Sequence, residues 1–336
     1  MRSVAFEKCY SSAQHDDRYV RVARLMPVAE WDAHYELVAE IQTLKRERNA
    51  VILAHNYQRP EVYHGVADFC GDSLELAHRA AQSSSDVIVL CGVRFMAETA
   101  KLLAPKKTVL LPDATAGCSL AESITAADVR ALRARHPGVP VVCYVNTSAA
   151  VKSECDVCCT SSNALTVVES LGAEEVILVP DEYLAAHVSA HTRVHVIPWK
   201  GHCEVHERFT GREVREYRDA SQAYVLAHPE CPRDVQEAAD FVGSTSGMIS
   251  ALERRRPSQA MLVTECSMAD NISSSFPEIQ FLRPCNLCPH MQRISLFGVR
   301  NSLLHLSIAI EIQDDVADGA RRAVQRMLEL GRPREL

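Results

Sequence analysis

A short apolar run that stops at a proline and is followed by a cysteine occurs three times: TVLLP at 108–112 before Cys118, VHVIP at 194–198 before Cys203, and IQFLRP at 279–284 before Cys288. Each run is typical of a β-strand. Successive prolines are 86 residues apart, and successive cysteines are 85 residues apart. The chain therefore contains a threefold internal repeat with a period of about 85 residues.

Each repeat also has an earlier strand that leads into polar residues: VILA at 51–54, VVC at 141–143 and YVLA at 224–227. Further apolar runs follow at 87–90 and 176–179, and we match 241–243 to them as a weaker third. Helical patterns at 72–81 and 162–168 connect the strands. Short apolar strands that alternate with helices predict parallel sheets covered on both faces.

We therefore expect an α/β fold of three domains related by approximate threefold symmetry. They occupy residues 30–117, 118–202 and 203–300. Residues 301–336 form a C-terminal segment, helical from Asn301 to Leu330, that packs back on the first domain. Ligands of open α/β sheets bind beyond the carboxyl ends of the strands, where the polar residues of each repeat lie. The repeats thus predict a central site shared by three domains.

Composition limits the classes of function. The 336 residues include 36 basic and 43 acidic side chains, and this net charge of -7 argues against a nonspecific nucleic-acid binder. The sequence shows no signal-peptide pattern and no apolar run long enough to span a membrane, so we expect a cytoplasmic protein. In that compartment thiols stay reduced, and the 13 cysteines indicate metal binding or catalysis for those that cluster.

Equal spacing can bring Cys118, Cys203 and Cys288 together where the three domains meet. A single cysteine is more often a small buried hydrophobe, but three at one period are not explained that way. Three thiolates suit zinc with one open position, or an iron-sulfur cluster with one iron not held by cysteine. The C-x-x-C pairs at 155–158 and 285–288 leave a zinc ribbon as a weaker alternative, because more than 100 residues separate them.

The sequence resembles the quinolinate synthases over residues 40–305. The strings that carry the resemblance, in order along the chain, are HNYQ at 55–58, GDSLEL at 71–76, MAETAK at 96–101, AGCSL at 116–120, YVNT at 144–147, CTSSNA at 159–164, GHCEVH at 201–206, HPEC at 228–231, GSTSGM at 243–248 and CPHM at 288–291. Each string alone is weak, but their order and spacing are specific.

The resemblance implies αβα domains around a pseudo-threefold axis and a [4Fe-4S] cluster held by Cys118, Cys203 and Cys288. It also implies a reaction of de novo NAD biosynthesis. In that reaction iminoaspartate, supplied by an L-aspartate oxidase or dehydrogenase, condenses with dihydroxyacetone phosphate to give quinolinate, phosphate and two waters. A metal- or redox-sensing regulator that binds zinc or a labile cluster through the same cysteines is the alternative from another class.

The resemblance assigns roles to residues at the strand ends. Glu230 is the expected base, with a pKa raised by partial desolvation. His55 and Tyr57 handle protons on the triose-derived carbons. His228 lies two residues before Glu230, and strand alternation would put both side chains on one face.

The substrates are anions, so the site needs hydrogen-bond donors. Ser73, Ser161 and Thr245 lie at or near expected helix starts, where free N–H groups attract anions, although a plain N-cap is the simpler interpretation of each. Tyr144 and Asn146 after the second-domain strand, and His206 after Cys203, complete the expected pocket.

Two positions depart from the family pattern. Tyr63 and His64 stand where relatives commonly carry a Gln-Asp pair, and Leu282 stands where some have a further cysteine. We therefore expect Cys285 to be an incidental thiol, either on the surface or beside the residues of the site, with a redox partnership with Cys288 as the alternative.

Overall fold

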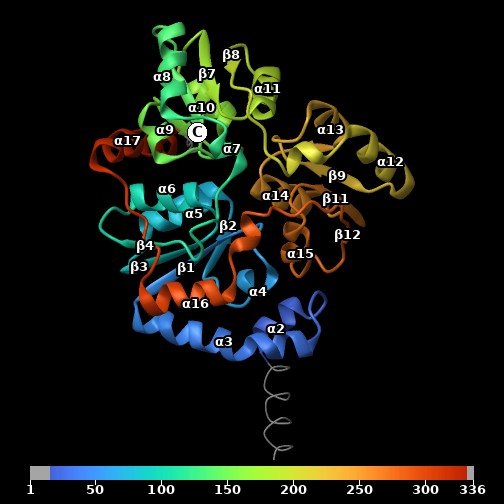
Figure 1. Cartoon of the computed structure of the whole chain (residues 1–336). Coiled ribbons are helices and arrows are strands. Elements are labelled where there is room, and N and C mark those ends of the chain that lie inside the picture. The colour runs from blue at the N-terminus through green and yellow to red at the C-terminus, as the bar shows by residue number, and fades with distance from the viewer. Residues whose placement is uncertain (1–15, 331–336) are drawn as a thin grey trace, which may run out of the picture.

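The computed structural model describes residues 16–330, which build three four-stranded sheets, all of them parallel. Each sheet has its second strand at one edge, then its first, third and fourth strands. The orders are β2 (Phe69–Gly71), β1 (Ala50–His55), β3 (Val87–Cys91), β4 (Thr108–Leu110); β6 (Val157–Cys159), β5 (Val141–Tyr144), β7 (Glu175–Val179), β8 (His195–Pro198); and β10 (Phe241–Val242), β9 (Tyr224–Ala227), β11 (Gln259–Val263), β12 (Gln280–Leu282). One topology used three times confirms the repeat, and Figure 1 shows the three units grouped around a common centre.

Helices cover the sheets, as the apolar strands require. The central strands β1 and β3 are almost entirely buried. Helices α5 (Ser73–Gln82) and α6 (Arg94–Leu103) pack on one face of the first sheet, while α3 (Val28–Glu47) and α16 (Leu296–His305) pack on the other (Figure 1). The remaining helices are α2 (Asp17–Val22), α4 (Pro60–Tyr63), α7 (Ser119–Glu122), α8 (Ala126–Arg135), α9 (Ala149–Ser153), α10 (Ala164–Ser170), α11 (Glu182–His191), η1 (His206–Arg208), α12 (Gly211–Ser221), α13 (Arg233–Ala238), α14 (Thr245–Arg255), α15 (Ser267–Ser273), η2 (Met291–Arg293) and α17 (Asp314–Leu330).

The third repeat aligns differently from the sequence prediction. We matched residues 241–243 to the central runs at 87–90 and 176–179, and this match is wrong. Phe241–Val242 is the edge strand β10, equivalent to β2 and β6, whereas the central position belongs to β11 (Gln259–Val263). Its polar first residue, Gln259, and the arginine-rich end of the preceding helix hide β11 from a search for apolar runs.

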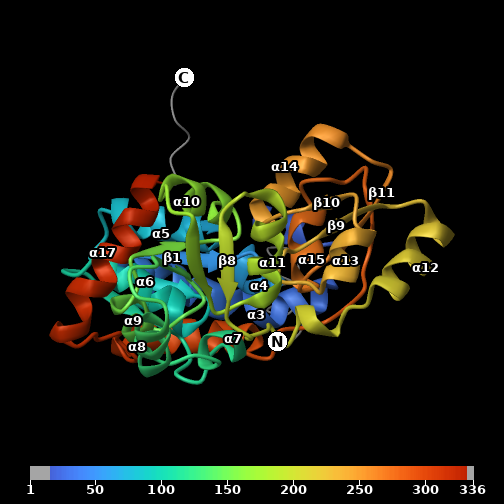
Figure 2. The ribbon, with the colours of Figure 1, turned by 90° about the horizontal axis from the view of Figure 1, so that it is seen from above.

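The C-terminal segment also differs from its prediction. Instead of one helix over 301–330, the chain forms α16 and α17, which are separated by residues 306–313. Leu306 and Ile308 adopt positive φ angles of 49° and 59° there, which an α-helix does not allow. Helix α16 packs on α3, but α17 packs mainly on α9 and β6 of the second unit and also on α6 of the first (Figure 2). Residues 331–336 of the expected segment lie outside the described residues.

The ends of the central strands decide where ligands can bind. In each sheet the first and third strands run parallel in register, as in Cys143 beside Val179, so their carboxyl ends reach the same edge. The three edges face the centre of the molecule. No helix among residues 16–330 is long and apolar enough to cross a membrane.

Candidate active site

One cavity of about 730 Å³ lies where the three units meet. All thirteen residues that the sequence singled out line it: His55, Tyr57, Ser73, Cys118, Tyr144, Asn146, Ser161, Cys203, His206, His228, Glu230, Thr245 and Cys288. They come from the ends of the first strands and the segments after them, from the segments after the fourth strands, from the starts of helices α5 and α14, and, for Ser161, from the turn that follows β6. The described residues that line the cavity include no lysine or arginine, so an anion in it would be bound by neutral hydrogen-bond donors.

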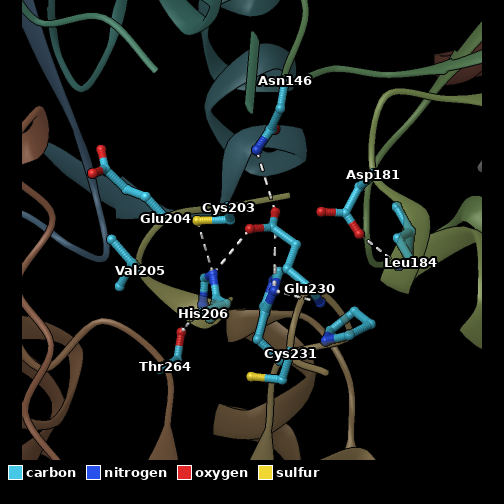
Figure 3. Close-up of polar contacts among 12 residues, drawn as sticks. Asn146, Asp181, Leu184, Cys203, Glu204, Val205, His206, Glu230, Cys231 and Thr264 are labelled. Atoms are coloured by element: carbon cyan, nitrogen blue, oxygen red, sulfur yellow. Dashed lines mark hydrogen bonds and ion pairs between the residues drawn. The ribbon is translucent and has the colours of Figure 1, made fainter. Parts of the chain in front are cut away.

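Glu230 is the centre of the polar contacts (Figure 3). Its carboxylate is buried, and Tyr144 donates a hydrogen bond of 2.6 Å to Oε1. Asn146 donates to the same oxygen at 3.3 Å, and His206 Nδ1 lies 2.9 Å from Oε2. Residues from two units therefore hold one carboxylate. Glu230 and His228 share the cavity because a tight turn beyond β9 points both inward, not because they alternate on a strand: the Glu230 N–H faces His228 Nδ1 at 3.3 Å.

The pKa of Glu230 is lower than the sequence suggested. Burial alone raises it, but the imidazoles of His228 and His206 and the Tyr144 hydroxyl outweigh burial and hold the pKa of Glu230 well below its ordinary value. The expectation of a raised pKa is therefore wrong. Desolvation dominates for the neighbouring bases instead, and burial lowers the pKa of His55 to about 4 and that of His228 to about 3. The site thus pairs an ionised carboxylate with neutral histidines at pH 7.

A second set of contacts runs through a threonine that the sequence analysis missed. Thr264 Oγ1 lies 2.6 Å from the Tyr57 hydroxyl and 2.9 Å from His206 Nε2. The His206 ring also stacks on His228, with 4.7 Å between ring centroids. Thr264 follows β11, the strand that the sequence did not reveal, so no pattern led to it.

The thiols and their neighbours can hold a metal. Burial raises the pKa of Cys118 to about 12 and that of Cys288 to about 11, so both stay protonated at pH 7 without a metal. Within the described part of the chain, one group of donor atoms, from Cys203, His206 and Glu230, lies within 4.8 Å of one another. Cys118 and Cys288 line the same cavity but do not belong to this close group. The cavity therefore offers cysteine thiols that are spread more widely than the ligands of one ion.

The three proposed anion donors differ in their surroundings. Thr245 is the first residue of α14, and its hydroxyl accepts a hydrogen bond of 2.9 Å from Asn56. Ser73 is the first residue of α5, whose N-cap Asp72 already accepts the N–H groups of Leu74 and Glu75. Ser161 is not at a helix start, because α10 begins three residues later at Ala164.

Further buried residues in or beside the cavity were not predicted. Glu265 lines it, and burial raises the pKa of its carboxyl to about 7 although Ser267 and Cys288 donate backbone hydrogen bonds to it. Asp181 caps α11 and turns its free oxygen toward Glu230 (Figure 3). Both carboxyls lie two residues beyond the third strand of a sheet, β7 for Asp181 and β11 for Glu265. The apolar run at 176–179 could have located Asp181, whereas β11 was not recognised in the sequence.

The remaining cysteines form other contacts. Cys285 forms a disulfide with Cys266, so the expectation of a free thiol, or of a partnership with Cys288, is wrong. Cys158 Sγ lies 3.3 Å from Cys143 Sγ inside the second sheet, whereas Cys285 follows β12 of the third sheet. Among the described residues, no group of metal-binding donors includes cysteines of both pairs. The two C-x-x-C pairs therefore do not form a zinc ribbon. His64, at the position that departs from the family pattern, is buried but does not line the cavity.

Thiol, imidazole and carboxylate donors in a cavity between three α/β units define an α/β enzyme whose active site can hold a metal. Residues 39–329 match the family model described as Quinolinate synthetase A protein. Quinolinate synthase 1 of Mesorhizobium japonicum is 59% identical over 311 residues, which cover 92% of this chain and 96% of that protein. Quinolinate synthase of Agrobacterium fabrum is 57% identical over 93% of this chain and 91% of its own, and that of Caulobacter vibrioides is 53% identical over 90% and 84%. The chain therefore belongs to the quinolinate synthetase A family.

Proposed function

We propose that this enzyme condenses iminoaspartate with dihydroxyacetone phosphate to give quinolinate, phosphate and two waters, in the de novo route to NAD. The observation that carries the proposal is the convergence of all thirteen predicted residues on one cavity in a chain of this family.

A [4Fe-4S] cluster held by Cys118, Cys203 and Cys288 is the cofactor that the donor set fits best. A single zinc ion has Zn–S distances of about 2.3 Å and needs its sulfurs close together. Cys118 and Cys288 stand outside the close donor group around Cys203, and one cysteine comes from each repeat, which suits a larger inorganic group. When bound, a cluster with one iron free of cysteine supplies a Lewis acid for the loss of water.

Glu230 is the proposed base, because it is ionised and faces the cavity. Tyr144, Asn146 and His206 fix both carboxylate oxygens, so the carboxylate has little freedom to turn. A base held within hydrogen-bond reach of a carbon acid contributes roughly 10²- to 10⁴-fold to the rate. The burial that surrounds it excludes competing water from the proton-transfer step.

His55 and His228 act as neutral donors in this proposal. His55 Nδ1 accepts the backbone N–H of Tyr57 at 3.2 Å, and His228 Nδ1 faces the N–H of Glu230. In a neutral ring whose Nδ1 accepts a hydrogen bond, the proton sits on Nε2. Each histidine therefore has one N–H, on Nε2, that can donate to a substrate. The Tyr57 hydroxyl adds a third polar group from the first unit, and together they can orient the triose-derived carbons.

Substrate carboxylates and phosphate require donors, which the first turns of α5 and α14 provide. Ser73 and Thr245 each offer a hydroxyl and the helix dipole at the cavity wall. Ser161 contributes a hydroxyl from a turn. An L-aspartate oxidase or dehydrogenase in the same cytoplasmic compartment would supply iminoaspartate.

Anaerobic incubation of the protein with both substrates, followed by mass detection of quinolinate, tests the proposal. The matched control is Cys118→Ser, which removes the thiol that follows β4 and is expected to give no product. Failure of the wild-type protein to form quinolinate while it holds its full iron content would refute the proposed function.

A further inference from the structure

Lys152 is a fully buried lysine of helix α9, in the second unit, and the proposed mechanism does not use it. Lysine is seldom fully buried unless its charge has partners. Its ammonium group donates to the carbonyl oxygen of Val145 at 2.8 Å and to that of Thr147. Nζ also lies 5.6 Å from the centre of the Phe95 ring, within the range of a cation–π contact. Two carbonyl groups and an aromatic face therefore compensate the buried charge.

The two carbonyl groups that Lys152 binds stand on either side of Asn146. The Asn146 side chain donates to Glu230 Oε1 at 3.3 Å (Figure 3). Tyr144, two residues earlier in the chain, donates to the same oxygen at 2.6 Å. One buried ammonium group thus holds the backbone before and after a residue that contacts the proposed base.

The other hydrogen bonds of this turn do not connect it to α9. The Thr147 N–H donates to Val145 O at 2.8 Å, and the Thr147 hydroxyl donates to Tyr144 O at 2.9 Å, so both bonds close the turn on itself. Removal of the ammonium group would leave the Thr147 carbonyl without this donor in a buried place, which is unfavourable. The turn can recover a donor for that carbonyl only by moving, and such a movement would carry Asn146 away from Glu230.

We propose that Lys152 is a positioning residue, whose buried ammonium group holds the turn at 145–147 so that Asn146 keeps its contact with Glu230. Lys152 does not line the cavity, so it acts on the reaction through Asn146. The kinetic consequence of this inference rests on the proposed function. Its structural part, the position of Asn146, does not depend on the reaction.

Lys152→Met tests the proposal in the holoenzyme. Methionine keeps an unbranched apolar side chain and removes both the charge and the N–H donors. Misplacement of reacting groups by about 1 Å can cost roughly 100-fold in rate. We therefore expect kcat, measured per cluster-loaded enzyme, to fall by about 10- to 100-fold, with KM little changed.

A double-mutant cycle with Asn146→Ala separates positioning from a general loss of stability. If Lys152 acts through Asn146, Lys152→Met should cost less than about twofold in kcat once Asn146 is alanine. An equal loss in both backgrounds, or a wild-type kcat for Lys152→Met alone, would overturn the proposal. Should Lys152→Met fail to fold, Lys152→Gln, which is one atom shorter and keeps an amide donor, goes through the same cycle with the same overturning results.

The matched control is Lys107→Met. The ammonium group of Lys107, a half-buried residue, also donates to a backbone carbonyl, that of Ser85. Lys107 precedes β4 and so lies at the amino end of the first sheet, opposite the strand ends that face the cavity. Lys107→Met should keep the wild-type kcat. A loss equal to that of Lys152→Met would show that the effect is not specific to the turn at Asn146 and would overturn the proposal.

A crystal structure of Lys152→Met distinguishes this inference from the proposed function. We expect the turn at 145–147 to shift and Asn146 Nδ2 to lie beyond hydrogen-bond distance of Glu230 Oε1. An unmoved Asn146 would refute the positioning role even if the enzyme makes quinolinate. Absence of quinolinate from the wild-type enzyme would instead refute the proposed function, and the position of Asn146 in the variant would then decide the role of Lys152.

Discussion

Replacement of Glu230 by Gln changes the charge of the site and almost nothing of its shape. The amide oxygen of Gln can take the place of Oε1 and still accept from Tyr144 and Asn146. The amide nitrogen then faces His206 Nδ1, where the carboxylate had an acceptor at 2.9 Å. The variant therefore keeps most of its packing but has no ionised group to take a proton.

The expected loss follows from the role of a general base. Such a base contributes about 10²- to 10⁴-fold, which at about 1.36 kcal/mol for each tenfold corresponds to roughly 2.7 to 5.4 kcal/mol in the activation barrier. We expect a loss within that range, because three donors fix the carboxylate and the amide that replaces it cannot take up a proton. The loss should appear in kcat, since Glu230 is not one of the proposed anion donors.

Anaerobic steady-state assays with mass detection of quinolinate measure this loss, after iron and sulfide contents show equal cluster loading. The control is Glu207→Gln, which removes an exposed carboxylate from the neighbouring helix η1. Glu207→Gln should retain the wild-type rate. A fully loaded Glu230→Gln enzyme that turns over at the wild-type rate would refute the assignment of the base.

Two predictions concern stability. Burial lowers the pKa of His64 to about 4, so the unfolded chain takes up this proton first as pH falls below 6.5. The unfolding free energy of the wild type should therefore fall by about 1 kcal/mol more than that of His64→Gln between pH 7.5 and pH 5.5. Urea denaturation that gives the same fall for both proteins would contradict this prediction. Met327→Ala leaves a hole under α17, where Met327 is fully buried, and should lower the unfolding free energy by about 2 to 5 kcal/mol with unchanged kcat. A urea midpoint equal to that of the wild type would show that α17 is not packed as described.

The internal repeat predicted the class of fold because a buried parallel strand can be recognised from its own short stretch of sequence. Strands covered on both faces must be apolar where they are buried, as β3 is throughout and β7 is after its exposed first residue, Glu175. The repeated prolines stand at or just beyond the fourth strands, which lie at a sheet edge where proline is tolerated. These signals recur at one spacing, so they reveal the repeat. Strands of two or three residues, such as β2 and β10, are too short to give a periodic signal.

The residues of the site could be named because the family resemblance assigns them, and His55, Tyr144 and His228 also end or follow strands that the sequence marks clearly. Their electrostatics could not, since the pKa of Glu230 depends on donors from another unit, more than 80 residues away. Thr264 and Glu265 were missed for a related reason: β11 precedes them, and its pairing with β9 and β12 is visible only in three dimensions. The disulfide of Cys285 likewise joins residues whose proximity no spacing predicts.

The central claim is that three repeats contribute one cysteine each to a single [4Fe-4S] cluster. Iron and acid-labile sulfide analysis of protein prepared without oxygen tests it most directly, with Cys118→Ser, Cys203→Ser and Cys288→Ser beside a Cys70→Ser control. We expect about four irons and four sulfides per chain in the wild type and the control, and loss of the cluster in each of the three variants. Bound zinc without sulfide, or full iron and sulfide in any of those three variants, would contradict the claim.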